Sequence, residues 1–201
     1  MAATPEPLSA NEHNRLLARI AALEADLAEA RGQVARAESL AHEDPLTGVL
    51  NRRGFARELE RAVAFHSRYD TPVSVMLFDI DGLKRVNDRY GHAAGDALIA
   101  GVARTLKRNL RVSDSLGRLG GDEFGVLVWH AAEEVAIAKS KQLQVTLDAS
   151  SATWSTGPLP LCASVGVAEI TRDGGADVAL TLADQRLYAD KSARRPEKKV
   201  A

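Results

Sequence analysis

The chain has 201 residues, of which 45% are hydrophobic and 26% charged, and its formal net charge is −1. This composition is typical of a globular protein with one core of ordinary domain size, and it excludes a largely disordered chain. The small net charge predicts no non-specific binding to nucleic acid or to an anionic membrane. Any phosphate must therefore be bound by locally placed cations.

Residues 1–10 are predicted to form a flexible N-terminus. They lack the apolar stretch of a signal peptide, and no run in the chain approaches the length that spans a bilayer. The single cysteine, Cys162, excludes an internal disulfide and fits a reducing compartment, so a cytoplasmic protein is expected. Cys162 lies in the apolar run "LCASVGVA", where we expect a buried side chain.

A helix with a heptad pattern is predicted over residues 11–43. Its apolar positions alternate in steps of four and three: Leu16, Ile20, Leu23, Leu27, Ala30, Val34, Ala37 and Ala41. The helix could pack on its own domain, but the 3.5-residue period and the narrow stripe favour a coiled coil. The alanines and Gly32 would make that coiled coil weak. The breakers in "HEDPLTG" end the helix, and the next domain is placed from residue 44.

From residue 49 the pattern is that of an α+β domain. Helices are predicted over 52–68, 95–110, 132–147 and 176–191, strands over 72–80, 114–120, 123–129 and 159–170, and a loop over 149–158. From residue 72 the order is βαββαβ, which is the ferredoxin-like split βαβ arrangement. In that arrangement the strands 72–80 and 123–129 are neighbours at the centre of the sheet.

Two acidic pairs stand at the ends of these neighbouring strands. Asp79 and Asp81 close one strand on a single face, and Asp122 and Glu123 open the other. Each pair by itself could be a solvated turn or a hairpin turn. Together they would crowd one corner, where carboxylates repel one another unless a cation neutralises them. Oxygen ligands of this kind suit Mg²⁺ or Mn²⁺, and Mg²⁺ commonly brings substrate phosphates with it.

Four blocks of sequence make the pattern specific. They are "DPLTGVLNRR", "FDIDGLKRVNDRYGHAAGD", "GGDEF" (120–124) and "LADQRLYADK". In this order and spacing, residues 44–195 resemble the GGDEF family, the diguanylate cyclases. The resemblance implies a palm-type nucleotide cyclase domain over 44–196, preceded by the coiled-coil helix and followed by a basic tail, 197–201.

The resemblance also implies an activity, the condensation of two GTP into cyclic di-GMP with release of two pyrophosphates. By similarity, Asp79 and Asp122 are metal ligands, the Ile80 carbonyl is expected to add a further one, and Glu123 is a further ligand or assists deprotonation. Two metal ions would activate the attacking 3′-hydroxyl and neutralise charge on the phosphates. Gly120 and Gly121 carry no Cβ, which lets a nucleotide approach the backbone closely.

The triphosphate is expected to lie against backbone N–H groups of "DGLK", residues Asp81, Gly82, Leu83 and Lys84. The Lys84 side chain either adds to this contact or is a solvated charge. The closing helix of the family also uses a lysine and an arginine against the phosphates, which here are Lys191 and Arg195. The alternative for these two residues is a basic helix end that complements the helix dipole.

Guanine recognition maps by position to Asn87 and Asp96. An acidic side chain at Asp96 would accept a hydrogen bond from guanine N1–H, which adenine lacks, and so would favour GTP over ATP. The alternative for Asp96 is an N-cap of the helix expected to begin at Ala97.

"RVSD" (111–114) lies where the family has its product-inhibition site. Arg111 would bind a guanine edge or a phosphate of cyclic di-GMP, and Asp114 would accept from guanine. The alternative is an exposed salt pair of little energetic value. The family usually adds an arginine from the helix after the signature, whereas this helix carries only Lys139 and Lys141 as cations.

Each GTP must attack the other, so the activity needs two domains that face each other. A parallel coiled coil would make this homodimer by raising the effective concentration of one domain for the other. The main rival hypothesis is a silent receptor that binds cyclic di-GMP through Arg111 and Asp114. A third is a scaffold that carries a vestigial domain.

Overall fold

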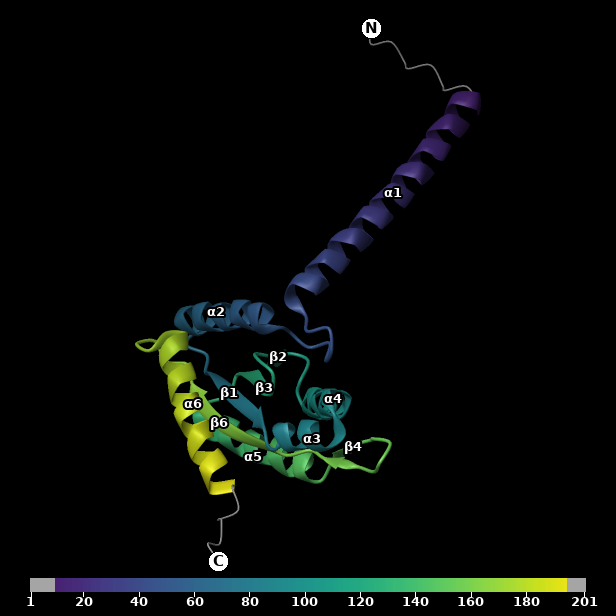
Figure 1. Cartoon of the computed structure of the whole chain (residues 1–201). Helices are drawn as coiled ribbons and strands as arrows, with labels where there is room; N and C mark the ends of the chain where they lie inside the picture. Colours follow the sequence, from purple (N-terminus) through teal and green to yellow (C-terminus); the bar gives the residue numbers. More distant parts are fainter. Residues whose placement is uncertain (1–9, 195–201) are drawn as a thin grey trace, which may run out of the picture. The chain divides into compact units, whose positions relative to one another are not determined.

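The computed structural model describes residues 10–194, which divide between Ala41 and His42 into a helical part and an α/β unit. Figure 1 shows the elements in chain order. The helical part is α1 (Ala10–His42) except for its last residue, His42, which belongs to the α/β unit.

The helix α1 carries an apolar stripe on its surface. Leu16, Ile20, Leu23 and Leu27 are 49–50% exposed within the described residues. Side chains of large apolar residues at this spacing leave area in water that a second helix would bury. The side chains of residues 34–40, which the heptad pattern includes, lie outside the described residues. The coiled coil therefore stays a prediction.

The α/β unit is built on a four-stranded antiparallel sheet of order β2-β3-β1-β6. These strands are β1 (Val73–Ile80), β2 (Ser115–Arg118), β3 (Glu123–Trp129) and β6 (Ala163–Glu169). β1 pairs with β3 on one side and β6 on the other. With two helices between β1 and β2 and one between β3 and β6, this is the split βαβ topology that the sequence predicts.

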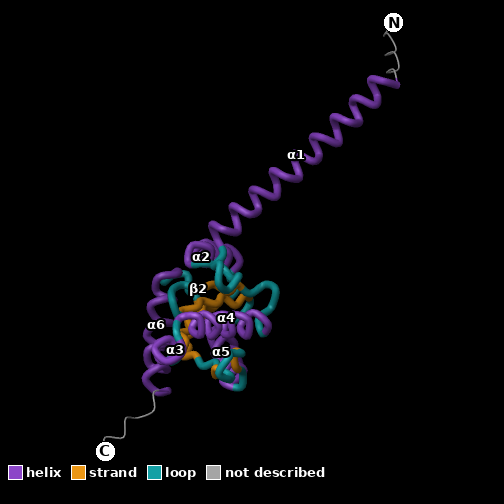
Figure 2. The backbone as a smooth tube through the Cα atoms, turned by 45° about the vertical axis from the view of Figure 1, so that its right-hand side comes forward, coloured by secondary structure: helices purple, strands orange, loops and turns teal. Residues whose placement is uncertain are grey.

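Helices cover both faces of the sheet, as Figures 1 and 2 show. On one side lie α2 (Arg52–Tyr69) and α6 (Gly175–Arg194), and on the other α3 (Leu83–Tyr90), α4 (His92–Arg108) and α5 (Glu133–Asp148). Side chains alternate along β1 between the two apolar cores: Val73 and Val75 face α2 and α6, whereas Met76 and Phe78 face α4 and α5. Both faces are covered, which explains why β1 is almost continuously apolar.

The helix α6 lies unusually close to β6 at Gly166. A Cβ atom at Gly166 would collide with the main chain of α6 at Ala183 and Leu187. Only glycine allows this approach, because every other residue carries a Cβ. The approach brings the last turns of α6 to the end of β1, where Lys191 forms an ion pair with Asp79.

The predicted first residue of the helix over 95–110 is wrong, because the helix begins at His92. The structure has two helices here, α3 and α4, and between them Gly91 adopts φ 83°. That conformation is open to glycine and interrupts the helical path. Asp96 lies inside α4, so the N-cap alternative for Asp96 is also wrong.

The strand predicted over 159–170 is two strands. β5 (Leu159–Pro160) pairs with β4 (Ser151–Ala152), which lies in the predicted loop, and β6 begins only at Ala163. Between them, the carbonyl of Cys162 accepts a hydrogen bond from the Asp81 amide at 2.9 Å. Cys162 is half-buried rather than buried, so that expectation is also corrected.

Candidate active site

The pairing of β1 with β3 brings the two acidic segments together. Asp79 lies directly opposite Glu123 in the register, and the amide of Ile80 donates to the carbonyl of Asp122 at 3.0 Å. Asp81 follows one residue beyond the end of β1. The four acids therefore lie at the same end of the two central strands, as the sequence predicts.

Asp79 is partly buried at this end of the sheet. Burial raises the pKa of the Asp79 carboxyl, and the charges of Asp122 and Asp81 raise it further, against a hydrogen bond from Lys191. The Lys191 ammonium lies 2.6 Å from Asp79 Oδ1. A carboxyl whose pKa is higher in the folded state stabilises the fold below its unfolded pKa, and this contribution is lost as pH rises through the folded pKa. Burial and the neighbouring carboxylates thus disfavour the ionised form of Asp79, and a further cation beside it would favour that form.

Asp81 has a different environment from Asp79. It accepts a hydrogen bond from Ser164 Oγ at 2.9 Å, and Arg194 Nε lies 3.4 Å from its other oxygen. Arg194 also pairs with Asp148, at the end of α5, at 2.7 Å. Asp81 and Arg194 therefore join the ends of β1, α5 and α6, which holds α6 in place at this site.

The turn that carries Gly120 and Gly121 is held by Arg118, which the sequence reasoning missed. Its guanidinium donates to the carbonyls of Gly120 at 3.2 Å and Gly121 at 2.8 Å. The same guanidinium forms an ion pair with Asp44 at 3.2 Å. The only signals in the sequence are the arginine two residues before the glycines and the acid of "DPLTG".

Asp44 is fixed in turn by its own neighbours. Thr47 donates to Asp44 Oδ1 from its backbone amide and from its hydroxyl. Burial alone would raise the pKa of the Asp44 carboxyl, but the hydrogen bonds from Thr47 and the charge of Arg118 together lower it. Asp44 therefore stays ionised and orients Arg118 toward the glycine turn.

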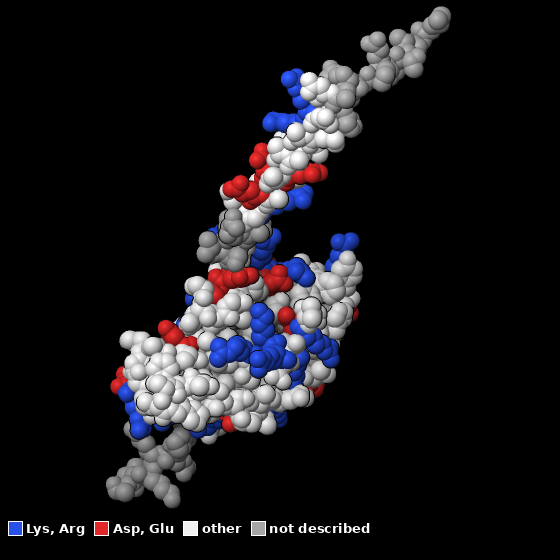
Figure 3. Space-filling view, turned by 90° about the vertical axis from the view of Figure 1, so that its right-hand side faces the viewer, with Lys and Arg blue, Asp and Glu red and all other residues white. Residues whose placement is uncertain are grey.

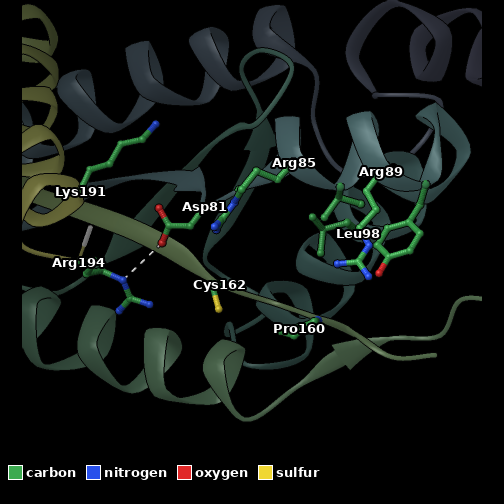
Figure 4. A pocket seen from close by; sticks show the side chains of 11 residues that line it. Asp81, Arg85, Arg89, Leu98, Pro160, Cys162, Lys191 and Arg194 are labelled. Atoms are coloured by element: carbon green, nitrogen blue, oxygen red, sulfur yellow. Dashed lines mark ion pairs between the residues drawn. The ribbon is translucent and has the colours of Figure 1, made fainter. Parts of the chain in front are cut away.

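A cavity of about 680 Å³ opens beside the acids. Its lining comes from the turn after β1, from α3, α4 and α6, and from the end of β5 and the segment after it (Figure 4): Asp81, Gly82, Arg85, Val86, Arg89, Tyr90, Leu98, Pro160, Cys162, Lys191 and Arg194. Apolar walls with a few convergent charged groups are typical of a small-molecule site.

The cavity includes some of the predicted nucleotide residues and not others. Asp81, Gly82 and Lys191 line it, whereas the other predicted nucleotide residues of the strand ends and of the start of α3 do not: Ile80, Leu83, Lys84, Gly120 and Gly121. Arg195 lies outside the described residues.

Comparisons with known proteins decide the family. The family described as "Diguanylate cyclase, GGDEF domain" matches residues 41–197. The chain belongs to the GGDEF family. The split βαβ fold and the acidic signature at the ends of its central strands are therefore those of a GGDEF domain.

Individual relatives agree with this assignment. The chain is 31% identical over 186 residues to diguanylate cyclase DgcP of Pseudomonas aeruginosa. The aligned region covers 92% of this chain and 28% of that protein. It is 33% identical over 161 residues to the probable diguanylate cyclase DgcT of Escherichia coli, covering 79% of this chain and 35% of that protein. The chain thus spans about a third of the length of these relatives.

A solved structure has the same combination of parts. The coiled coil and GGDEF domain of DgcB from Caulobacter crescentus, in complex with c-di-GMP, is 28% identical with a TM-score of 0.81. The match covers 90% of this chain and 96% of that chain. The α+β fold with an N-terminal helix is thereby confirmed. Among the described residues of this chain, no helix is both long enough and apolar enough to cross a membrane.

Asn87 and Asp96 of the GGDEF domain lie on α3 and α4. The Asn87 amide oxygen is buried and has no hydrogen-bond partner among the described residues. It packs against the Cα of Gly95, where a Cβ would collide with it, so Gly95 is a further residue that sequence reasoning missed. Asp96 is exposed, and neither Asn87 nor Asp96 lines the 680 Å³ cavity.

Arg111 and Asp114 line a second cavity, of about 510 Å³. Arg111 is exposed, whereas the Asp114 side chain is only 1% exposed. Asp114 accepts hydrogen bonds from the Arg111 backbone amide at 3.0 Å and from Lys139 of α5 at 3.1 Å. The helix α5 contains no arginine, but its Lys139 places a cation beside Asp114.

The carboxylates at this end of the sheet are too few to hold a metal ion alone, but they suit one that also binds substrate phosphates. Within residues 10–194, no three His, Cys, Asp or Glu side chains are gathered closely enough to hold a metal ion. Asp79 and Asp122 nevertheless interact electrostatically at the ends of paired strands. Mg²⁺ is commonly held by one or two carboxylates, with substrate phosphates and water completing its coordination. The residues present fit that arrangement.

Proposed function

We propose that the chain is a diguanylate cyclase, which condenses two GTP into cyclic di-GMP and releases two pyrophosphates. The observation that carries this proposal is the placement of Asp79 at the end of β1 and of Asp122 directly before the paired strand β3, beside Lys191 and the glycine turn. The 3′-oxygen of each GTP forms a bond to the α-phosphorus of the other, the bond to the leaving pyrophosphate breaks, and the hydroxyl proton departs.

Asp79 and Asp122 would hold Mg²⁺ or Mn²⁺ together with the carbonyl of Ile80. When bound, the metal supplies charge that acidifies the 3′-hydroxyl and neutralises the α-phosphate and the leaving pyrophosphate. Glu123 is exposed at the start of β3, and its carboxylate folds back over Gly120. From that position Glu123 would add a further ligand or accept the hydroxyl proton.

Residues of the cavity, of α3 and α4 and of the glycine turn would orient the nucleotide. Backbone N–H groups from Gly82 onward face the phosphates at the start of α3, and Lys191 must exchange its pairing with Asp79 for the triphosphate. The buried, unpartnered oxygen of Asn87 and the exposed Asp96 are proposed to read the guanine edge. Gly121 has open space where a Cβ would stand, which leaves room for the nucleotide beside the turn.

The active form is proposed to be a homodimer, because one GTP per domain presents only half of the reaction. The half-exposed stripe of α1 is the surface that would join two copies. A parallel pair of helices would tether two domains and raise the effective concentration of each for the other. The contribution of α1 would then be proximity rather than chemistry.

Incubation of the purified chain with GTP and Mg²⁺ is expected to yield cyclic di-GMP and two pyrophosphates for each product molecule. Because two domains must meet, specific activity should rise with protein concentration until the dimer is saturated. Chromatographic resolution of the nucleotides measures both. Absence of the cyclic dinucleotide at high protein concentration, with cyclic di-GMP still bound, would favour the receptor instead.

Product is proposed to inhibit through Arg111 and Asp114. Their shared 510 Å³ cavity has a buried carboxylate and an exposed guanidinium, which match the donors and phosphates of cyclic di-GMP. Lys139 would supply the second cation.

Arg111→Ala is expected to raise the cyclic di-GMP concentration for half-inhibition by about tenfold or more, since it removes a charge-assisted contact to a phosphate or guanine. The measurement is the rate of GTP consumption against added product. The matched control is Arg57→Ala, an exposed arginine of α2. An inhibition curve identical to that of the unmodified protein would refute this site.

A further inference from the structure

Cations line the 680 Å³ cavity, but two of them are already neutralised. Lys191 forms its ion pair with Asp79 at 2.6 Å. Arg194 forms ion pairs with Asp81 at 3.4 Å and with Asp148 at 2.7 Å. A phosphate that contacts either residue must therefore compete with carboxylates already in place.

Arg85 and Arg89 differ from this pair. They lie one turn apart on α3, they line the same cavity, and neither forms an ion pair within the described part of the chain. Arg89 stacks on the ring of Tyr90, with its Cζ 5.1 Å from the ring centre. Figure 4 shows Arg85 extending from α3 toward the part of the cavity where Asp81 lies. Arg85 is thus an uncompensated cation that points into the cavity.

The Arg85 guanidinium turns back toward the N-terminus of its own helix. Its Nη2 atom lies 3.0 Å from the place where a Cβ would stand on Gly82, the N-cap residue of α3. Gly82 provides no side-chain hydrogen bond to the first turn, and that turn contains no acid. The free N–H groups of the first turn carry partial positive charge. The guanidinium and these N–H groups therefore converge on one place.

The charge around this place is positive as well. The exposed charged residues of α3 and α4 are mainly basic: Lys84, Arg85, Arg89, Arg104, Lys107 and Arg108, against Asp88 and Asp96. Figure 3 shows Lys and Arg side chains gathered on the face of the α/β unit that looks to the right in Figure 1, where α4 lies. Such a field attracts an anionic ligand and raises its rate of association.

We propose that Arg85 is a further phosphate-binding residue, which holds the triphosphate of GTP against the N-terminus of α3. This inference rests on the proposed function, because it names an additional contact to the same substrate. An arginine can donate two parallel hydrogen bonds to phosphate oxygens, whereas a lysine acts as a point charge. The competing interpretation of Arg85 is a solvated surface arginine with no ligand.

The test measures binding rather than turnover. The full chain is titrated, with Mg²⁺, against a GTP analogue that carries a methylene group between its α- and β-phosphorus atoms, and separately against guanosine. Arg85→Ala is expected to weaken binding of the analogue about tenfold and that of guanosine by less than about twofold. Arg85→Lys should lose less than Arg85→Ala, because it keeps the charge but not the paired donors.

Arg57→Ala is the matched control, since Arg57 is an exposed arginine of α2 that does not line the cavity. It should bind both ligands as the unmodified chain does. Equal affinity of Arg85→Ala and the unmodified chain for the analogue would overturn the role of Arg85 while leaving the proposed function intact. An equal loss for analogue and guanosine would overturn it too. An unmodified chain that binds no analogue would contradict both.

Discussion

Asp79→Asn is expected to lower the rate of cyclic di-GMP synthesis by at least about a thousandfold. Asparagine keeps the shape of the side chain and can still accept a hydrogen bond from Lys191, but it removes the negative charge that would hold the metal. Only the charge and the second carboxylate oxygen are lost. The measurement is the initial rate with saturating GTP and Mg²⁺.

This loss of activity should not come from unfolding. Burial and the charges of Asp122 and Asp81 raise the pKa of Asp79, so its ionised form is disfavoured in the folded protein. Loss of the pair with Lys191 acts in the opposite direction, and the net change in unfolding free energy should stay within about 1 kcal/mol. Asp184→Asn, at an exposed position of α6, is the matched control. A near-normal rate for Asp79→Asn would contradict the metal assignment.

Gly166→Ala is expected to lower the free energy of unfolding by about 3 kcal/mol or more. The added methyl group would collide with the α6 main chain at Ala183 and Leu187, and neither a carbonyl nor an amide can rotate away as a flexible side chain can. Either α6 moves off the sheet or β6 distorts, and both outcomes expose the core. Denaturant unfolding followed by circular dichroism measures the change.

Gly121→Ala is the control for this measurement, because a Cβ there meets open space. Its unfolding free energy should match that of the unmodified chain within about 0.5 kcal/mol. Its activity should nevertheless fall, since the methyl group would occupy room proposed for the nucleotide. If Gly166→Ala unfolds at the same denaturant concentration as the unmodified chain, the close packing of α6 on β6 is refuted.

Local pattern was sufficient for much of the fold. Apolar alternation and helical spacing predict β1, β3, α2, α5 and α6 within a few residues of their bounds. Errors occurred where a single backbone conformation or a break decided the outcome. The positive φ of Gly91 divides α3 from α4, and the hydrogen bond from the Asp81 amide to the Cys162 carbonyl lies in the gap between β5 and β6. Neither feature leaves a periodic signal.

The sequence by itself determined the family, the α+β topology and the proximity of Asp79 to Asp122. Helices and strands follow from periodicity over short distances, and the family follows from the order of the motifs. The proximity of the two acids follows from the order of the strands. Only the tertiary structure decided which charges pair. Arg118 meets Asp44 from 74 positions away, Lys191 meets Asp79 from 112, and Arg85 is left without a carboxylate partner among the described residues. Ion pairing depends on a few ångströms of separation after all elements have packed, and no spacing along the chain encodes that distance.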